Sequence, residues 1–473
     1  MEQFNRILTS INDFIWNIPL IVLILAVGIL LTIRVGVLQI HKLPLALKYM
    51  LSDEKEAEGE VSAFGALCTA LSATIGTGNI VGVATAIAAG GPGALFWMEL
   101  AAFFGMATKY AEGLLAVKYR EIDKNGKVLG GPFYYIEKGL GRKWRWLAKI
   151  FAVFAMFAGL FGIGTITQVN GIASAVQNFF DPRLESIAFS VSGNSYSWAV
   201  VISGIIVTVC AALVIIGGIK RISKVSQVIV PFMALLYFVC CIILIITNIT
   251  KLPDAIVLIV KSAFAPQAIF GGAVGITIKA AMQNGIARGI FSNEAGLGSA
   301  PIAAAAAKTK EPVRQGLVCM TGTFFDTIII CTMTGLSIVL TGAYQFAMEG
   351  SLKGAAVTTK AFETGLPFSN SVCAFLLMIC LAFFAFTTIL GWDYYSERCL
   401  QYLVGDKKKI LMTYKALYIA AILIGPYLTI SFVWKLADIF NGLMALPNLI
   451  ALFALSGVVA AETKSYFSRN KKL

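Results

Sequence analysis

The sequence predicts an all-α polytopic membrane protein of eleven transmembrane helices, with one N-terminal helix followed by a five-plus-five inverted repeat that contains discontinuous helices. Of its 473 residues 58% are hydrophobic and only 13% are charged, whereas a soluble domain carries about 25% charged residues. The apolar residues form long blocks, such as 199–219 and 228–247, close to the ~20 residues that cross a bilayer. Two blocks are interrupted by polar residues and glycines at matching places in the two halves, as in inverted-repeat transporters.

Eleven apolar blocks are separated by charged or Gly/Pro-rich segments, and each is predicted to be helical because an open strand in lipid would leave backbone groups unpaired. The first block stops at Arg34 and lacks a small-x-small cleavage site, so we predict a membrane span and not a cleaved signal. The predicted spans lie near 18–36, 62–90, 93–117, 147–177, 196–217, 225–247, 268–304, 315–341, 369–397, 410–430 and 436–460.

The predicted spans divide the chain into four parts. They are an extra N-terminal helix and loop (1–61), a first repeat of five helices (62–250), a second repeat (251–463) and a basic tail (464–473).

The formal net charge of +13 is explained by the loops between the spans. One set of alternate loops holds 26 lysines and arginines, including eight between Lys118 and Arg145, and the other set holds only seven. By the positive-inside rule the rich set is cytoplasmic. We therefore expect a multi-pass protein of the cell membrane with its N-terminus outside and its C-terminus in the cytoplasm, and no nucleic-acid partner.

Cysteine and histidine usage argues against catalysis. The nine cysteines lie mostly inside apolar blocks without a C-x-x-C pair, and His41 is the single histidine. Cysteines in such positions are typically small packing residues. Since no set of nucleophile, base and acid is apparent, we predict a protein that is not an enzyme and has no organic cofactor.

Two spans carry helix-breaking residues. The second contains Gly76-Thr-Gly-Asn79 near its middle, and the seventh, at 268–304, is too long for one straight crossing. Interrupted helices in both halves are the best sequence indication of a midplane binding site, although glycines also allow close helix packing. The glycines and asparagine of the seventh span are Gly271, Gly272, Gly275, Asn284, Gly285, Gly289, Gly296 and Gly298.

An unwound helix at Gly76–Asn79 would free backbone groups on both sides. The amides of Thr77 and Gly78 would face a carboxylate, assisted by the dipole of the helix end. The carbonyls between Ser72 and Ile75 could replace the hydration shell of a hard cation. This chemistry suits a zwitterion and a cation together, without the cost of a charged side chain at the bilayer centre.

Four motifs resemble those of the alanine/glycine:cation symporters: Ser292-Asn-Glu-Ala-Gly-Leu-Gly-Ser-Ala-Pro301, Gly130-Gly-Pro-Phe-Tyr-Tyr135, Thr388-Ile-Leu-Gly-Trp392 and the stretch 72–82. The resemblance runs from about Phe64 to Arg398. It implies the inverted-repeat fold of the bacterial leucine transporter with an extra N-terminal helix.

The resemblance also implies a substrate site. Thr77 and Gly78 match the backbone that holds the substrate carboxylate, and Gln168 matches a polar side chain that faces the substrate. Met282 and Trp392 match bulky residues that restrict the pocket to alanine or glycine. Two alternatives remain open. Gln168 could instead form a hydrogen bond between helices, and Trp392 could be an anchor at the membrane interface.

Sodium is the cation that the resemblance implies. Thr387 and Thr388 match a hydroxyl pair that completes a sodium site with the carbonyls of Ser72 and Ile75. Asn79 and the carbonyl of Thr74 match a second cation position near the carboxylate. The alternative for the two threonines is a hydrogen bond to their own helix backbone.

Ionisable residues inside the predicted spans are functional candidates by default. Lys109 and Glu112 are three residues apart and could pair on one helix face. Arg288, Glu294 and Asp326 are predicted to form an ionic network at the inner gate, with Lys279 as another possible partner for Asp326. Glu99 lies in the third span.

Together these features lead to one expected function and three rivals. We expect sodium-coupled import of alanine or glycine by alternating access in a lipid bilayer. A proton-driven symporter with Asp326 or Glu99 as carrier is the nearest alternative. An intramembrane enzyme would need a catalytic dyad, and a channel would not need a second solute. L- or D-preference, stoichiometry and oligomeric state do not follow from the sequence.

Overall fold

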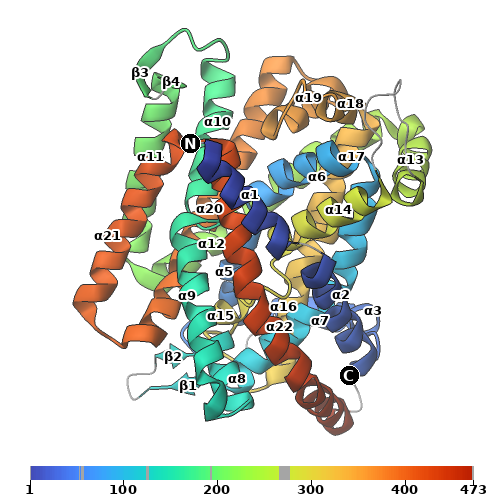
Figure 1. Cartoon of the computed structure of the whole chain (residues 1–473). Coiled ribbons are helices and arrows are strands. Elements are labelled where there is room, and N and C mark those ends of the chain that lie inside the picture. Colours follow the sequence, from blue (N-terminus) through green and yellow to red (C-terminus); the bar gives the residue numbers. More distant parts are fainter. Residues whose placement is uncertain are drawn as a thin grey trace.

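The computed structural model describes residues 2–16, 18–52, 54, 58–123, 127–191, 194–265 and 277–470, and these form a helical bundle with two short hairpins (Figure 1). The helices of the first half are α1 (Glu2–Ile15), α2 (Ile18–Arg34), α3 (Leu38–His41), α4 (Leu43–Met50), α5 (Ala63–Thr74), α6 (Val83–Gly90), α7 (Gly93–Lys118), α8 (Pro132–Gly139), α9 (Arg145–Phe161), α10 (Ile166–Phe180), α11 (Trp198–Ile215) and α12 (Gly218–Thr247).

The second half is also helical. Its helices are α13 (Leu252–Phe264), α14 (Ile278–Asn293), α15 (Ala300–Ala304), α16 (Pro312–Thr323), α17 (Thr332–Leu340), α18 (Ala343–Met348), α19 (Ala355–Gly365), α20 (Asn370–Val404), α21 (Lys408–Ile424) and α22 (Ile430–Arg469). Short 3₁₀ helices are η2 (Arg142–Trp144), η3 (Ile249–Lys251) and η5 (Gly425–Tyr427), and π-helical turns are η1 (Gly78–Gly82) and η4 (Phe324–Cys331). The antiparallel hairpins are β1 (Glu121–Ile122) with β2 (Val128–Leu129), and β3 (Ile187–Val191) with β4 (Asn194–Ser197).

Nine helices in the described part of the chain are long and apolar enough to cross a membrane, and α5 with α6, bent by 49°, gives a tenth candidate. The surface agrees with a lipid environment. On α11, Ile206 and Leu213 are more than half exposed while Ser203 and Thr208 are buried, the reverse of a soluble helix. The seventh predicted span, 268–304, falls partly outside the described residues, so the count of eleven stays a prediction.

The two hairpins lie at opposite ends of the bundle. Figure 1 shows β1, β2, α8 and the C-terminal end of α22 at the lower end, and β3, β4, α18 and α19 at the upper end. The lower end includes the described basic residues of the segment 118–145 and, from the tail, Lys464 and Arg469. The charge asymmetry of the sequence is therefore an asymmetry of the folded molecule, while its orientation in the membrane remains a prediction.

The first predicted interruption is present but narrower than expected. Ser62 caps α5 by accepting a hydrogen bond from the Gly65 amide at 3.0 Å. The helix ends at Thr74, and Ile75 is extended with φ −76° and ψ 94°. Gly78 and Asn79 lie in the π-helical turn η1 and not in unwound chain. The Asn79 side chain explains this, because its Oδ1 accepts the Gly76 amide at 2.9 Å and closes the turn.

The second interruption separates α14 from α15. Glu294, Gly296 and Gly298 have φ values of 58°, 88° and 80°, in the left-handed region that ends a helix. Gly285 and Gly289 lie inside α14 and pack against Ala94 and Met98 of α7, so packing explains these two glycines. The expectation for Gly271, Gly272 and Gly275 concerns residues outside the described part of the chain.

Candidate functional site

The two helix interruptions meet in the interior. A Cβ placed on Gly78 would lie 3.1 Å from the Cα of Ser292, the last residue but one of α14. The absence of a side chain at Gly78 therefore allows the π-turn of the first broken helix to touch the backbone of the second. This contact places the loosened backbone of both helices around a common point.

Thr77 has polar groups that are not used by regular structure. Its amide donates to Gln168 Oε1 on α10 at 3.0 Å, and its hydroxyl is buried without a hydrogen-bond partner among the described residues. Gln168 is held in place because its Nε2 donates to the Ile163 carbonyl at 2.8 Å. Buried polar atoms are normally satisfied, so the free Thr77 hydroxyl marks a place for a ligand. Gln168 does link two helices here, and its contact with substrate stays a prediction.

The carbonyls at the end of α5 have lost their usual donors. The Gly76 amide is taken by Asn79 and the Thr77 amide by Gln168, so the carbonyls of Ser72 and Ala73 lack their i+4 partners. From α20, the Thr388 hydroxyl donates to the Ile75 carbonyl at 3.2 Å. Several oxygens without any formal charge are the ligands that a hard cation such as sodium prefers, so these groups fit a sodium ion as a transported substrate.

The predicted hydroxyl pair is not equivalent in the structure. Thr387 donates to Phe383 O and Phe384 O of its own helix at 3.1 and 3.0 Å and contacts Met233 Sδ on α12 at 3.5 Å. Backbone bonding, the alternative weighed above, therefore describes Thr387 in this conformation. Thr388 bonds both ways, to Phe384 O at 3.0 Å and across to α5. A ligand role for either residue stays a prediction.

Asp326 joins both broken helices. It is fully buried in η4, and its Oδ1 accepts Asn79 Nδ2 at 2.8 Å. Its Oδ2 accepts the hydroxyls of Ser292 and Thr327, each at 2.8 Å. Three donors to one carboxylate fix its position. Through Asn79, Asp326 therefore holds the Gly76 amide and the first interruption in place.

The predicted inner-gate network of Arg288, Glu294 and Asp326 is wrong. Arg288 forms a bidentate ion pair with Asp438 of α22, with N–O distances of 3.1 and 2.5 Å, and it also lies over the ring of Trp434. Asp438 lies 150 residues away along the chain, so no local spacing could indicate the pair. The position of Asp438 within the last predicted span could have indicated that it has a charged partner, since buried charges require partners.

Lys109 and Glu112, which could pair on one helix face, form no ion pair within 4 Å among the described residues, although the charge of Lys109 acts on Glu112. Glu112 Oε1 instead accepts the amides of Gly296 and Gly298 at 3.1 and 3.2 Å and Asn448 Nδ2 at 2.7 Å. Lys109 Nζ is buried without a hydrogen bond in that part of the chain. Glu112 therefore fixes the second interruption by accepting two of its amides, which lie between α14 and α15.

Trp392 and Met282, the two predicted bulky residues, lie in different places. Trp392 is fully buried and donates to Glu294 Oε1 at 2.8 Å, so it borders the second interruption and is not an interface anchor. Met282 is half-buried on α14, ten residues before Ser292, which is about 15 Å along a helix. The structure does not bring Met282 to the interruption.

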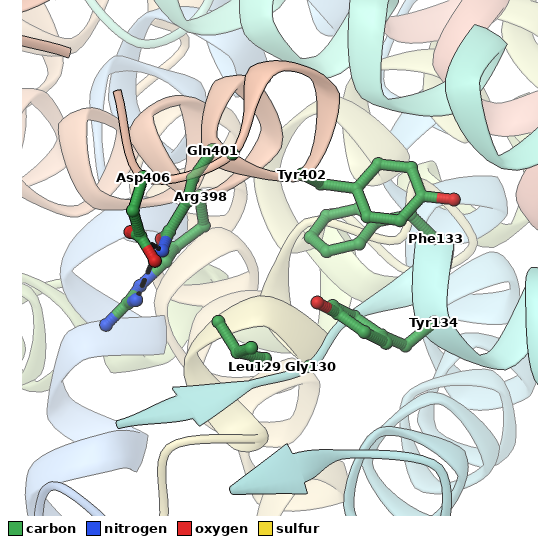
Figure 2. Close-up of a pocket in the computed structure, with 9 residues that line it drawn as sticks. Leu129, Gly130, Phe133, Tyr134, Arg398, Gln401, Tyr402 and Asp406 are labelled. Carbon is green, nitrogen blue, oxygen red and sulfur yellow. Dashed lines mark hydrogen bonds between the residues drawn. The ribbon is translucent and has the colours of Figure 1, made fainter. Parts of the chain in front are cut away.

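A separate cavity of about 190 Å³ lies at the lower end of the bundle, between the aromatic rings of α8 and the end of α20 (Figure 2). On its charged side Arg398 donates to both oxygens of Glu60 at 2.9 and 3.1 Å. Asp406 accepts Lys127 Nζ at 2.8 Å, and this hydrogen bond holds the pKa of the Asp406 carboxyl below its usual range. The sequence reasoning did not single out this cluster.

The Glu60 end of this cluster is tied to both broken helices. The Glu60 amide donates to the Ala306 carbonyl at 2.9 Å and the Lys308 amide to the Val61 carbonyl at 2.8 Å, which joins the chain before α5 to the chain after α15. Arg398 on α20 thus holds the joined ends of the two broken helices against a helix that is not broken.

Comparison with known proteins identifies relatives over the whole chain. The sequence model described as the sodium:alanine symporter family matches residues 1–473. The chain is 56% identical over 465 residues to an uncharacterized transporter of Haemophilus influenzae, with 98% of this chain and 96% of the relative covered. It is 46% identical over 472 residues to the sodium/alanine symporter AgcS of Methanococcus maripaludis, with 98% and 97% covered.

The fold has a solved counterpart. The crystal structure of MhsT in complex with L-phenylalanine superimposes with a TM-score of 0.57 at 11% identity and covers 86% of this chain and 98% of that one. With the ten candidate spans, these likenesses describe a multi-pass, cation-coupled amino-acid transporter and not an enzyme. The chain belongs to the sodium:alanine symporter family.

Proposed function

We propose that this protein imports alanine or glycine by symport with sodium. The observation that carries the proposal is Thr77, whose amide is occupied by the carbonyl oxygen of Gln168 and whose buried hydroxyl has no described partner. The Gln168 oxygen occupies the position that an oxygen of the substrate carboxylate would take. With the Gly78 amide beside it, the substrate carboxylate has donors at a helix end.

A small substrate is supported by the close packing at the interruption. A Cβ on Gly171 would lie 2.6 Å from Thr77 Cγ2, and one on Gly78 would lie 3.3 Å from the Phe291 ring. The buried Trp392 ring, which donates a hydrogen bond to Glu294, bounds the site on the side of the second interruption. A site enclosed this tightly favours a substrate whose side chain has one carbon or none. Met282 would line the site only after a change of conformation.

Sodium would bind beside the substrate carboxylate. The carbonyls of Ser72 and Ile75 and the hydroxyl of Thr388 supply oxygens on the α5 side, and Thr387 would join them by changing its rotamer. A second position would use the Thr74 carbonyl and Asn79, whose Oδ1 now accepts the Gly76 amide. A cation here lowers the cost of burying a carboxylate at the bilayer centre, which is the physical basis of coupling.

Alternating access follows from the proposed arrangement. We infer inverted repeats at 62–250 and 251–463, flanked by 1–61 and 464–473, in a cell-membrane protein whose N-terminus is outside. The Glu60–Arg398 pair would then hold the cytoplasmic side closed and would break when the joined ends of the broken helices swing away from α20. Filling both sites shifts the population toward that opened state.

Transport into proteoliposomes tests the proposal. We expect labelled alanine to accumulate under an inward sodium gradient, glycine to compete, and equimolar potassium to give no accumulation. Uptake that persists without sodium and collapses with an uncoupler would instead support a proton-driven symporter with Glu99 as carrier, since Asp326 already accepts three hydrogen bonds. Uptake that never saturates would indicate a channel.

Thr388→Val is expected to raise the sodium concentration for half-maximal uptake at least tenfold. It removes one oxygen ligand while keeping the size of the side chain, and a tenfold change corresponds to about 1.4 kcal/mol. The control is Thr85→Val, since the Thr85 hydroxyl bonds only the Val81 and Gly82 carbonyls of its own helix among the described contacts. Equal sodium dependence in both variants would remove Thr388 from the cation site.

A further inference from the structure

Asp393 is a buried carboxyl that the proposed site does not use. It follows Trp392 on α20, but the two side chains face different neighbours. Trp392 reaches Glu294 at the second interruption, whereas the charges that act on Asp393 are those of Glu397 and Lys415, the latter on α21. Asp393 is fully buried, and neither of its oxygens has a hydrogen-bond partner in the described part of the chain.

An ionised carboxylate in this position would be costly. Burial of a charge without hydrogen bonds costs several kcal/mol, and such a group normally becomes neutral instead. Asp326 shows the contrast within the same molecule, because three donors surround its equally buried carboxylate. The two aspartates therefore differ in their surroundings: three donors compensate a charge on Asp326, whereas no described donor would compensate one on Asp393.

The groups around Asp393 do not provide the missing charge compensation. Lys415 Nζ lies 3.2 Å from Glu397 Oε2, so the nearest positive charge is committed to a second carboxylate. Tyr414 and Tyr418 also approach from α21, but their hydroxyls donate to the backbone carbonyls of Met156, Gly164 and Ile389. On the side of α9, Gly159 packs against Ser396 and contributes no charge.

We propose that Asp393 is a proton-binding site, which holds a proton while α20 and α21 are packed together and exchanges it through Glu397 and Lys415. The side chains of Lys415 and Glu397 are 13% and 22% exposed, whereas that of Asp393 is fully buried. They therefore connect the buried acid to the surface one helical turn away. Loss of the proton converts the Asp393 acid to a carboxylate. The proton passes to water, and no other bond changes. This inference does not depend on which amino acid or cation occupies the helix interruption.

Infrared spectroscopy of the full-length protein in lipid tests the protonation state directly. We expect the difference spectrum of wild type minus Asp393→Asn at neutral pH to contain the C=O band of a protonated carboxylic acid. The control is Asp406→Asn, because Asp406 accepts Lys127 at the surface, and its difference spectrum should contain carboxylate bands of the wild type and no C=O band of a carboxylic acid. A carboxylate band in place of the acid band in the Asp393→Asn difference would overturn the proposal.

Transport measured against pH tests the exchange. Burial favours the protonated acid. The uptake that depends on protonated Asp393 is therefore present at low pH and is lost as the pH rises and Asp393 ionises. Wild-type uptake should fall at alkaline pH by up to about tenfold per pH unit, the limit for one proton, while Asp393→Asn should show no such fall because an amide cannot ionise. The same alkaline fall in both proteins would contradict a role for Asp393.

Discussion

Gly76→Ala is expected to lower sodium-driven amino-acid uptake by about 100-fold. An alanine Cβ at this position would lie 2.5 Å from Thr388 Oγ1 and 3.0 Å from Gln168 Oε1, so it would push apart the groups proposed to hold the cation and the carboxylate. Overpacking in a tight core costs about 1–3 kcal/mol, and 2.7 kcal/mol corresponds to about 100-fold in rate. The measurement is initial uptake into proteoliposomes at matched protein content.

Gly82→Ala is the matched control for this prediction. Gly82 ends the π-turn of the same broken helix with a helical φ of −62°, and a Cβ there would meet no atom within 4 Å. We expect uptake close to wild type, since alanine is the better helix former. Wild-type activity in Gly76→Ala, or equal losses in both variants, would mean that the contact with Thr388 and Gln168 does not matter for transport.

Asp326→Asn is expected to reduce uptake by a similar factor while leaving the protein folded. An asparagine can accept at only one of its two polar atoms, so its amide would face a donor, either Asn79 Nδ2 or the Ser292 hydroxyl. A buried donor without an acceptor costs about 1–3 kcal/mol. Because Asn79 holds the Gly76 amide, the damage should reach the first interruption and appear as weaker sodium and substrate binding.

Asp326→Glu separates position from charge. The longer acid keeps the negative charge but moves its oxygens away from the three donors. We expect it to be impaired almost as strongly as the asparagine variant, whereas Asp254→Asn, at an exposed aspartate of α13, should behave as wild type. Full activity in Asp326→Glu would mean that Asp326 acts through its charge and not by positioning Asn79 and Ser292.

The sequence predicted those features that local residue types determine. Glycines and an asparagine within an apolar block indicated the first interruption, where the Thr77 amide bonds to the Gln168 side chain and not to a helix carbonyl. The position of the second interruption was less clear, because Gly285 and Gly289 serve packing and the helix ends only where Glu294 adopts φ 58°. An apolar pattern does not distinguish these two uses of glycine.

Contacts between distant segments could not be predicted in the same way. Arg288 has its partner in Asp438 and Glu112 has its partners in the amides of the second interruption, whereas the sequence reasoning placed both among charges nearer along the chain. Buried charges in membrane proteins are almost always paired, but the identity of the partner depends on helix packing. For the same reason, only the folded structure shows that Asp393 has no hydrogen-bond partner among the described residues.

The central claim is that the first interruption binds the cation and the amino-acid carboxylate side by side. It is tested most directly by the affinity of the purified protein for alanine with and without sodium. The account predicts that sodium raises alanine affinity at least tenfold over potassium, that alanine raises sodium affinity by the same factor, and that Gly82→Ala keeps this linkage while Thr388→Val loses it. Alanine affinity that is equal in sodium and potassium would contradict the account.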